Sequence, residues 1–472
     1  MNHGATLLHL RGAAGMAAIY RKISWRLLPL LMLCCVMAYI DRVNVDHAQR
    51  QIQADLGFTT HVFAWGAGAF FVAYALFAVP CNLLLEKLGA RKILLRMMLG
   101  WGAATAAGAF VRTPMEFYTI RFLLGMCEAG FFPGVILYLT YWYPAARRAR
   151  VFAVFASATL IGGIVAGPLS DAVLRALHLH SGLQGWQWLL LAQGLPAALL
   201  GIAAYFYLDD SPDDARWLSR FEQQMVQQDL ARDDALLAAA AGTSAQRQDD
   251  DEDEDDEEPS AFAILWSLLR DPAICLLALA NLLLGGAGYA LVHWAPALLQ
   301  RWGAAMPAQL GLLVLLPNIA GIVGMIAIGY DSDRRRERRG HFIACMVLAA
   351  GGLGLAIAAD NGLAWSLAGL TLASLGIASA PPLLVVILTD LLNRQRAAAG
   401  IALVAGLGVM GGAFGPALGA RVLAWGDSAA MLAALIGMYL AAGLILMLAL
   451  RMAPRRGGPN ARHGLSDKIA RN

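Results

Sequence analysis

Twelve apolar stretches, each long enough to cross a bilayer as a helix, most strongly limit how this chain can fold. A transmembrane helix needs about 20 apolar residues, whereas a membrane β-barrel uses alternating segments of about ten. A soluble fold could not bury these stretches, because 59% of the 472 residues are hydrophobic and only 15% are charged; soluble domains have about 25% charged residues. The sequence therefore predicts an all-α integral membrane protein with twelve transmembrane helices. The predicted spans are 26–47, 62–85, 93–111, 115–143, 150–174, 186–208, 272–300, 308–330, 341–359, 363–390, 397–423 and 428–451.

Two sequence patterns recur at nearly the same distance along the chain. Gly-x-x-x-Gly-Pro at 163–168 recurs at 411–416, and an acid followed by a basic pair at 86–92 recurs at 333–339. A shared offset indicates two six-helix pseudo-repeats, and secondary transporters of this kind hold their substrate between the repeats. The glycine patterns predict close helix packing and bending.

Lysine and arginine residues set the predicted orientation. Twelve spans place every second loop on the same side of the membrane as the N-terminus. Of the 36 lysine and arginine residues, 29 lie on that side and five lie on the other. The positive-inside rule therefore places both termini and the linker between the two six-helix repeats in the cytoplasm. We expect a multi-pass protein of the inner (cytoplasmic) membrane. The linker, residues 209–271, carries an acidic run at 249–258 to which the sequence pattern assigns no particular role. Translation could start at Met1 or Met16. The predicted order is a segment 1–25, a bundle 26–208, a linker 209–271, a bundle 272–451 and a tail 452–472.

Several classes of protein find no support in the sequence. The basic residues sit in short loops rather than on one face, which argues against nucleic-acid binding. No H-E-x-x-H, G-x-S-x-G or phosphate-binding glycine loop occurs in context, so we predict no enzyme, no metal and no cofactor beyond a proton gradient. The cysteines form no C-x-x-C pair and are expected to be buried small side chains. They are Cys34, Cys35, Cys81, Cys127, Cys275 and Cys345.

Four ionisable residues interrupt the apolar spans: Asp41, Arg42, Arg121 and Glu128. Each costs about 2.5–3.5 kcal/mol at a helix centre on insertion scales, so each needs a partner, a watery cavity or a function. At 1.5 Å per residue, Asp41 lies about 22 Å from the inner boundary and Arg121 about 9 Å from the outer one. These depths coincide in a core of about 30 Å, so the two can pair. Glu128 projects from the same helix face as Arg121, nearer the midplane.

The four charges sum to zero, which suggests a mechanism. A bound carboxylate adds negative charge, and a proton taken up by Asp41 or Glu128 restores the balance. The pattern thus predicts proton-coupled symport of an organic anion. The alternative for Asp41 and Arg42 is that they open the outer loop, because 24–40 already spans 17 residues. Tyr74 and Tyr289 are weaker candidates that could contact substrate or serve in packing.

Four segments resemble one known family, the anion:cation symporter branch of the major facilitator superfamily. The resemblance covers nearly the whole chain and is most specific in the Arg121 segment. It implies the major facilitator fold, alternating access and proton-driven uptake of a carboxylate. The segments are Tyr39-Ile-Asp-Arg-Val-Asn44, Val79-Pro-Cys-Asn-Leu-Leu-Leu-Glu-Lys-Leu-Gly-Ala-Arg91, Arg121-Phe-Leu-Leu-Gly-Met-Cys-Glu-Ala-Gly-Phe-Phe-Pro-Gly134 and Leu137-Tyr-Leu-Thr-Tyr-Trp-Tyr-Pro144.

The resemblance also implies roles for individual residues. Asp41 and Glu128 would carry the coupling protons, and Arg42, Arg121 and Tyr74 would form the substrate site, to which we add Tyr289. A gating loop would contain Lys87, Arg91 and Lys92, with Asp333 at the matching place in the second half.

One segment departs from the family pattern. Members often have Asn-Ser-x-Gly-Asn-x-Gly-Gly in helix 11, whereas this chain has Ala405-Gly-Leu-Gly-Val-Met-Gly-Gly412. Fewer hydrogen-bond donors argue against a heavily hydroxylated sugar acid and favour a less polar or aromatic carboxylate.

Two other functions remain open from sequence. The chain could be a proton-coupled exporter or antiporter of small organic molecules, because the pattern at 163–168 resembles a drug-antiporter motif. It could also be a membrane receptor that binds without transporting. The expected partners are a small carboxylate and the lipid bilayer, and we expect a monomer.

Overall fold

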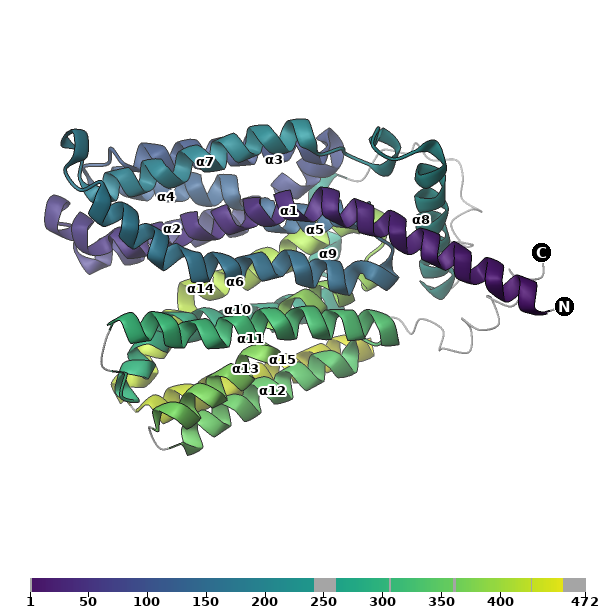
Figure 1. The fold of residues 1–472 in the computed structure, drawn as a ribbon. Coiled ribbons are helices and arrows are strands. Elements are labelled where there is room, and N and C mark those ends of the chain that lie inside the picture. The colour runs from purple at the N-terminus through teal and green to yellow at the C-terminus, as the bar shows by residue number, and fades with distance from the viewer. Residues whose placement is uncertain (1, 242–259, 305–306, 360–361, 426, 453–472) are drawn as a thin grey trace.

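The computed structural model describes residues 2–241, 260–304, 307–359, 362–425 and 427–452. Eleven helices in this part of the chain are long and apolar enough to cross a membrane, and α3, which starts with a basic turn, is the twelfth. The predicted twelve-helix, all-α fold is confirmed (Figure 1). The membrane-length helices are α1 (Asn2–Leu56), α2 (Thr60–Leu88), α3 (Ala90–Gly108), α4 followed by α5 (Pro114–Glu128 and Phe131–Thr140), α6 (Ala145–Ala176), α7 (Gly185–Tyr207), α10 (Pro272–Arg301), α11 (Pro307–Arg335), α12 (Arg339–Ala358), α13 (Leu363–Leu391), α14 (Arg394–Trp425) and α15 (Ser428–Met452).

Helix ends follow from local sequence. Gly57 follows α1 with φ of 68°, a left-handed conformation that glycine adopts without strain and that commonly ends a helix. Thr113 and Glu116 form a reciprocal capping box at the start of α4, with Pro114 in the first turn. Asp271 caps α10 by accepting a hydrogen bond from the backbone of Ala273.

Two predicted spans differ in the structure. The helix α1 runs on to Leu56, so Asp41 and Arg42 lie inside it and do not open a loop. The span 115–143 is divided, because α4 ends at Glu128 and α5 begins at Phe131. Pro133 has no backbone N–H to continue the hydrogen-bond ladder there. Glu128 therefore lies at a break in this transmembrane segment.

The two sets of helices pack side by side as two bundles, α1–α7 and α10–α15 (Figure 1). Contacts between the bundles run along α6 with α11 and along α2 with α14. Small residues line these contacts: a Cβ on Gly329 of α11 would lie 2.8 Å from Cβ of Ala153 on α6. A Cβ on Gly406 of α14 would lie 3.1 Å from Cβ of Ala78. The bundles therefore meet closely.

The helix α8 (Arg220–Ala241) crosses one end of the bundles, which we call the α8 end (Figure 1). Tyr20 donates a 2.8 Å hydrogen bond to Asp229, and Lys22 forms a 2.8 Å ion pair with Glu222. The Lys22 hydrogen bond holds the pKa of the Glu222 carboxyl below its usual range. These contacts fix α8 against the part of α1 around Tyr20 and Lys22. A shorter helix, α9 (Ala261–Leu269), precedes α10, and the acidic run 249–258 lies outside the described residues.

The two Gly-x-x-x-Gly-Pro patterns pack differently. In α14, a Cβ on Gly411 or Gly415 would clash with the backbone of Gly286, so close packing against α10 requires glycine. In α6, a Cβ on Gly163 or Gly167 would find its nearest neighbour at 3.5 or 3.8 Å, which is ordinary contact. The expected close packing is confirmed only for the second pattern.

Candidate functional site

Arg42 joins the two bundles at the centre of the molecule. Its Nε donates to Oε1 of Glu128 at 3.1 Å, its Nη2 donates to the same oxygen, and its Nη1 donates to the hydroxyl of Tyr289 at 3.0 Å. Glu128 comes from α4 and Tyr289 from α10, so one guanidinium contacts both halves. The Arg42 side chain keeps 17% of its surface exposed while Glu128 keeps 2%. Arg42 is thus the more exposed member of the pair.

Asp41 faces the interior of the first bundle. Its carboxylate accepts a 2.6 Å hydrogen bond from Thr105 of α3 and a 2.9 Å bond from Asn44. Only 1% of its surface is exposed. The predicted pairing of Asp41 with Arg121 is wrong: similar depth did not bring the two side chains into contact, and uncharged donors satisfy Asp41. Adjacent helical residues point about 100° apart, which explains why Arg42 faces the other bundle.

Arg121 is buried, with 7% of its surface exposed. Its guanidinium carbon lies 5.1 Å from the ring centre of Phe70, a cation–π distance. Neither its Nε nor its Nη1 has a hydrogen-bond partner among the described residues. Its charge interacts over longer range with Asp46, Glu128 and Asp41.

Aromatic rings surround Arg42. Its guanidinium carbon lies 5.4 Å from the ring centre of Tyr74 and 5.7 Å from that of Phe70. Phe71 stands edge-on to Tyr289 at 6.1 Å, across the contact between the bundles. The structure therefore brings together four predicted residues, Arg42, Glu128, Tyr74 and Tyr289, and adds Phe70 and Phe71, which sequence reasoning missed. Phe70 and Phe71 could not be identified from the sequence, because phenylalanines are common in an apolar helix.

Thr105 and Asn44 were also missed, although a signal existed. Thr105 lies 15 residues after the start of α3, or about 22 Å along it, which matches the depth of Asp41. Asn44 follows Asp41 by three residues and so shares its helix face. Depth arithmetic applied to polar as well as charged residues would have found both.

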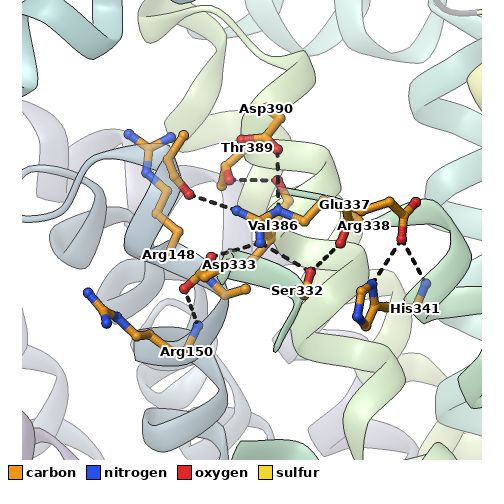
Figure 2. Close-up of polar contacts among 12 residues, drawn as sticks. Arg148, Arg150, Ser332, Asp333, Glu337, Arg338, His341, Val386, Thr389 and Asp390 are labelled. Atoms are coloured by element: carbon orange, nitrogen blue, oxygen red, sulfur yellow. Dashed lines mark hydrogen bonds and ion pairs between the residues drawn. The ribbon is translucent and has the colours of Figure 1, made fainter. Parts of the chain in front are cut away.

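A cluster of polar side chains connects the two bundles at the α8 end, and Figure 2 shows its contacts. Asp333 of α11 accepts hydrogen bonds from the backbone of Ala149 and Arg150 at 3.2 and 2.9 Å. Arg338 donates to Asp333 at 2.7 Å and to the carbonyl of Ala145 at 2.8 Å. These bonds attach α11 and the loop after it to the start of α6. Asp333 therefore lies where the halves must separate if this end opens.

Arg91 and Lys92, two of the other predicted gating residues, lie elsewhere, on α3. The backbone of Arg91 donates to Asp210 at 2.9 Å, and its Nε donates to the carbonyl of Tyr205 at 3.0 Å. Lys92 is exposed. Arg91 thus contacts the end of α7 within the first bundle, separately from the Asp333 cluster. Sequence position alone did not show which loop reaches across the two halves.

Asp333→Asn is expected to loosen the α8 end, because it removes the charge that pairs with Arg338. A charge-assisted hydrogen bond contributes about 1.5–3 kcal/mol, so the population open at this end should rise at least about tenfold. The measurement is the alkylation rate of Ala153→Cys, a buried contact of α6, in a background with the six native cysteines replaced.

Asp331→Asn is the matched control for Asp333→Asn. Asp331 lies on the same helix but pairs with Arg335 and His341, not with α6. The control should leave alkylation unchanged. Equal rates in both variants would show that the Asp333 contacts do not hold the halves together.

The fold and the site define an integral membrane transporter of two six-helix halves with an ionised centre between them. The chain belongs to the Major Facilitator Superfamily, whose family profile matches residues 31–360 and 304–470. It is 36% identical to a "Putative tartrate transporter" of Agrobacterium vitis, with 93% of this chain and 96% of that protein covered. It is 35% identical to a "Quinolone resistance transporter" of Acinetobacter baumannii, covering 84% and 87%.

Solved structures show the same fold. The proton:xylose symporter XylE aligns with a TM-score of 0.66 at 13% identity, covering 90% of this chain and 94% of that one. At that identity the likeness concerns the fold alone. The family profile and the "Putative tartrate transporter" agree with the resemblance to the anion branch found in sequence.

Proposed function

We propose that this protein is a proton-coupled symporter that takes up an organic carboxylate by alternating access. One observation supports it above the others: Arg42, a partly exposed cation at the contact between the halves, is held by the buried carboxylate Glu128. An anion that enters can replace Glu128 as the partner of Arg42 only if the charge of Glu128 is neutralised. A proton on Glu128 does this.

The coupling follows from charge balance in a medium of low dielectric. A carboxylate added to the site without a proton leaves an uncompensated buried charge, which costs several kcal/mol. Binding of proton and anion together keeps the net charge constant. Arg42 also donates a hydrogen bond to Tyr289 of the second half. Binding of an anion to Arg42 therefore affects a contact between the two halves.

Orientation is part of this proposal. The α8 end carries the linker helix and the basic first part of α1, which the positive-inside rule assigns to the cytoplasm. The Asp333 cluster would then be the cytoplasmic gate. Substrate would reach Arg42 from the opposite side, where Asp46 and His293 are exposed on α1 and α10.

The surroundings of Arg42 favour a carboxylate with an apolar or aromatic body. Phe70, Phe71 and Tyr74 are buried around the charge, and Tyr289 is partly exposed, so its ring can stack on a ring of the substrate. The second half contributes Tyr289, while the 405–412 segment of α14 presents glycine and apolar residues only. A polyhydroxylated acid would find few partners there for its hydroxyls.

The test is uptake by the purified protein in liposomes with an imposed inside-alkaline pH gradient. The panel contains tartrate, a sugar acid and an aromatic monocarboxylate. We expect a carboxylate to accumulate and to leak back when a protonophore is added. Absence of any proton-driven carboxylate uptake would overturn the proposal, and preference for tartrate would overturn only the aromatic substrate.

Export is the second candidate, favoured by the similarity to a "Quinolone resistance transporter". In that case the protein in the same liposomes would exchange a cationic or zwitterionic drug for protons and would not transport carboxylates. A receptor would bind ligand saturably without flux. The Arg42–Glu128 pair fits an anion better than a cationic drug, because its more exposed member, Arg42, is positive.

Tyr289→Phe is expected to weaken substrate binding about tenfold, because it removes the hydroxyl that holds Nη1 of Arg42, a bond worth about 1.5 kcal/mol. The ring contact with Phe71 is kept, so the fold should be unaffected. The measurement is the concentration for half-maximal counterflow. Tyr439→Phe is the control, because its buried hydroxyl lies in the second bundle with no hydrogen-bond partner among the described residues.

A further inference from the structure

A groove on the outer surface of the first bundle lies between α1 and α7, two helices that pack against each other. Its volume is about 300 Å³, at the lower end of the range of ligand-binding pockets. The residues that line it are Leu30 of α1 and Ala203, Phe206 and Tyr207 of α7. All four are apolar or aromatic, so the groove fits a hydrocarbon chain better than a polar solute.

A cation lies beside the groove, towards the α8 end. Arg26 precedes Leu30 by four residues, so the two share a face of α1 and are about 6 Å apart along its axis. The guanidinium carbon of Arg26 lies 3.6 Å from the ring centre of Tyr207, and its Nη2 donates to the Tyr207 carbonyl at 3.2 Å. Arg26 is half-buried, and this hydrogen bond lies at the surface. The groove therefore ends at a positive charge.

The two acids that follow α7 have other partners. Asp209 accepts a hydrogen bond from the indole of Trp217 at 2.8 Å, and Asp210 accepts one from the backbone of Arg91 at 2.9 Å. Arg26 contacts uncharged groups instead, including the Trp217 ring at 5.8 Å, and forms no ion pair with the described residues. Aromatic rings thus hold the guanidinium in place and leave its charge available to an anion.

Aromatic side chains around the groove indicate the level of the membrane surface. Trp25, Phe206 and Tyr207 are 75%, 77% and 38% exposed. Tryptophan and tyrosine gather at membrane–water interfaces, where the ring contacts lipid and the polar atom stays near the headgroups. Arg26 lies in the same helical turn as Trp25 and contacts Tyr207. The groove therefore extends from headgroup level into the hydrocarbon region.

We propose that this groove binds one anionic phospholipid of the leaflet at the α8 end, with an acyl chain in the groove and the phosphate at Arg26. Basic sites between transmembrane helices recognise anionic headgroups, and a guanidinium matches the geometry of a phosphate. An acidic peptide or a free phosphate would contact the arginine but leave the apolar groove empty. A zwitterionic lipid would fill the groove, but its ammonium group offsets the phosphate charge.

The site is independent of the proposed transport. Both α1 and α7 belong to the first bundle, so the groove does not depend on how the two halves move. It also lies apart from Arg42 and Glu128, because its lining contains neither residue. A failed transport assay would leave this proposal standing, and a failed lipid assay would leave the symport proposal standing.

The first experiment is native mass spectrometry of the purified full-length protein with phosphatidylglycerol or phosphatidylcholine. The wild type should bind its first phosphatidylglycerol about tenfold more tightly than its first phosphatidylcholine. Arg26→Gln should weaken phosphatidylglycerol binding about tenfold, because it removes a charge-assisted hydrogen bond, and should leave phosphatidylcholine binding nearly unchanged. Arg451→Gln is the matched control, since Arg451 is an exposed arginine in the last turn of α15, and it should keep the preference.

Ala203→Trp tests the groove without removing the cation. Ala203 is exposed, so a larger ring can occupy the groove without displacing buried residues. Binding of both lipids should fall. A phosphatidylglycerol with a photoactivatable group in its acyl chain should form adducts in the wild type near Leu30 on α1 and near Ala203 on α7. These adducts should be lost in Ala203→Trp.

Three results would overturn the proposal. Equal affinity of the wild type for the two lipids, or an unchanged preference in Arg26→Gln, would exclude recognition of the headgroup by Arg26. Adducts confined to other helices would exclude the groove. Displacement of phosphatidylglycerol by millimolar inorganic phosphate would identify a general anion site and not a lipid site.

Discussion

Glu128→Gln is expected to abolish proton-driven accumulation of the substrate and to leave substrate exchange within about twofold of the wild type. The glutamine keeps an oxygen that can accept from Arg42, but it carries no charge and takes up no proton. It therefore resembles the protonated state in which Arg42 is available to an anion. The variant should bind substrate at every pH and lose the link between the proton gradient and uptake.

The size of this effect has a thermodynamic limit. One pH unit is worth about 1.4 kcal/mol, so a symporter that moves one proton with one monoanion can concentrate its substrate about tenfold across that gradient. The wild type should approach this ratio with inside-alkaline liposomes. Glu128→Gln should equilibrate at a ratio of about one, while counterflow of labelled substrate continues.

Asp171→Asn is the matched control for this experiment. It makes the same carboxylate-to-amide change on an exposed residue of α6 whose ion pair with Arg175 lies at the surface. Such pairs contribute little, so both accumulation and counterflow should persist. If Glu128→Gln stops counterflow together with accumulation in a folded protein, Glu128 is a structural or substrate-binding residue and not a proton carrier.

The transmembrane architecture could be predicted from sequence because it depends on length and polarity alone. Each apolar span forms one helix, except 115–143, which forms two, and the intramembrane charges were identified by their cost in lipid. The break after Glu128 could not be read from hydropathy, since Ala129 and Gly130 are as apolar as a helix interior requires. Close packing of Gly130 against Met97 and Cys81, which only the folded bundle provides, accompanies it.

The sequence could not predict which side chains contact one another. Depth along the membrane placed Asp41 and Arg121 at one level, but the rotation of each helix about its axis decides which side chains meet. Arg42 was placed correctly as an intramembrane charge, yet its contacts with Glu128 and Tyr289 depend on how α1 turns towards α4 and α10. Asp333 was singled out by the repeat, but its attachment to α6 depends on how the halves dock.

Arg42→Ala is expected to lower both counterflow and accumulation more than 100-fold. It removes the cation that the substrate carboxylate contacts, and it leaves Glu128 buried without a partner. Breaking a buried pair in this way costs about 3–5 kcal/mol, so the variant should also lose thermal stability. Arg42→Lys keeps the charge but cannot hold Glu128 and Tyr289 together, since an ammonium lacks the planar fork of a guanidinium. Its counterflow should fall about tenfold or more.

The double variant Arg42→Ala with Glu128→Gln separates the loss of substrate binding from the loss of thermal stability. Removing both charges leaves no uncompensated ion, so thermal stability should return towards that of the wild type. Counterflow should stay absent, because the substrate still lacks its cation. If counterflow returned with stability, Arg42 would serve only to neutralise Glu128, and the anion would have to bind elsewhere. The buried and partly unsatisfied Arg121 would then be the remaining candidate for its partner.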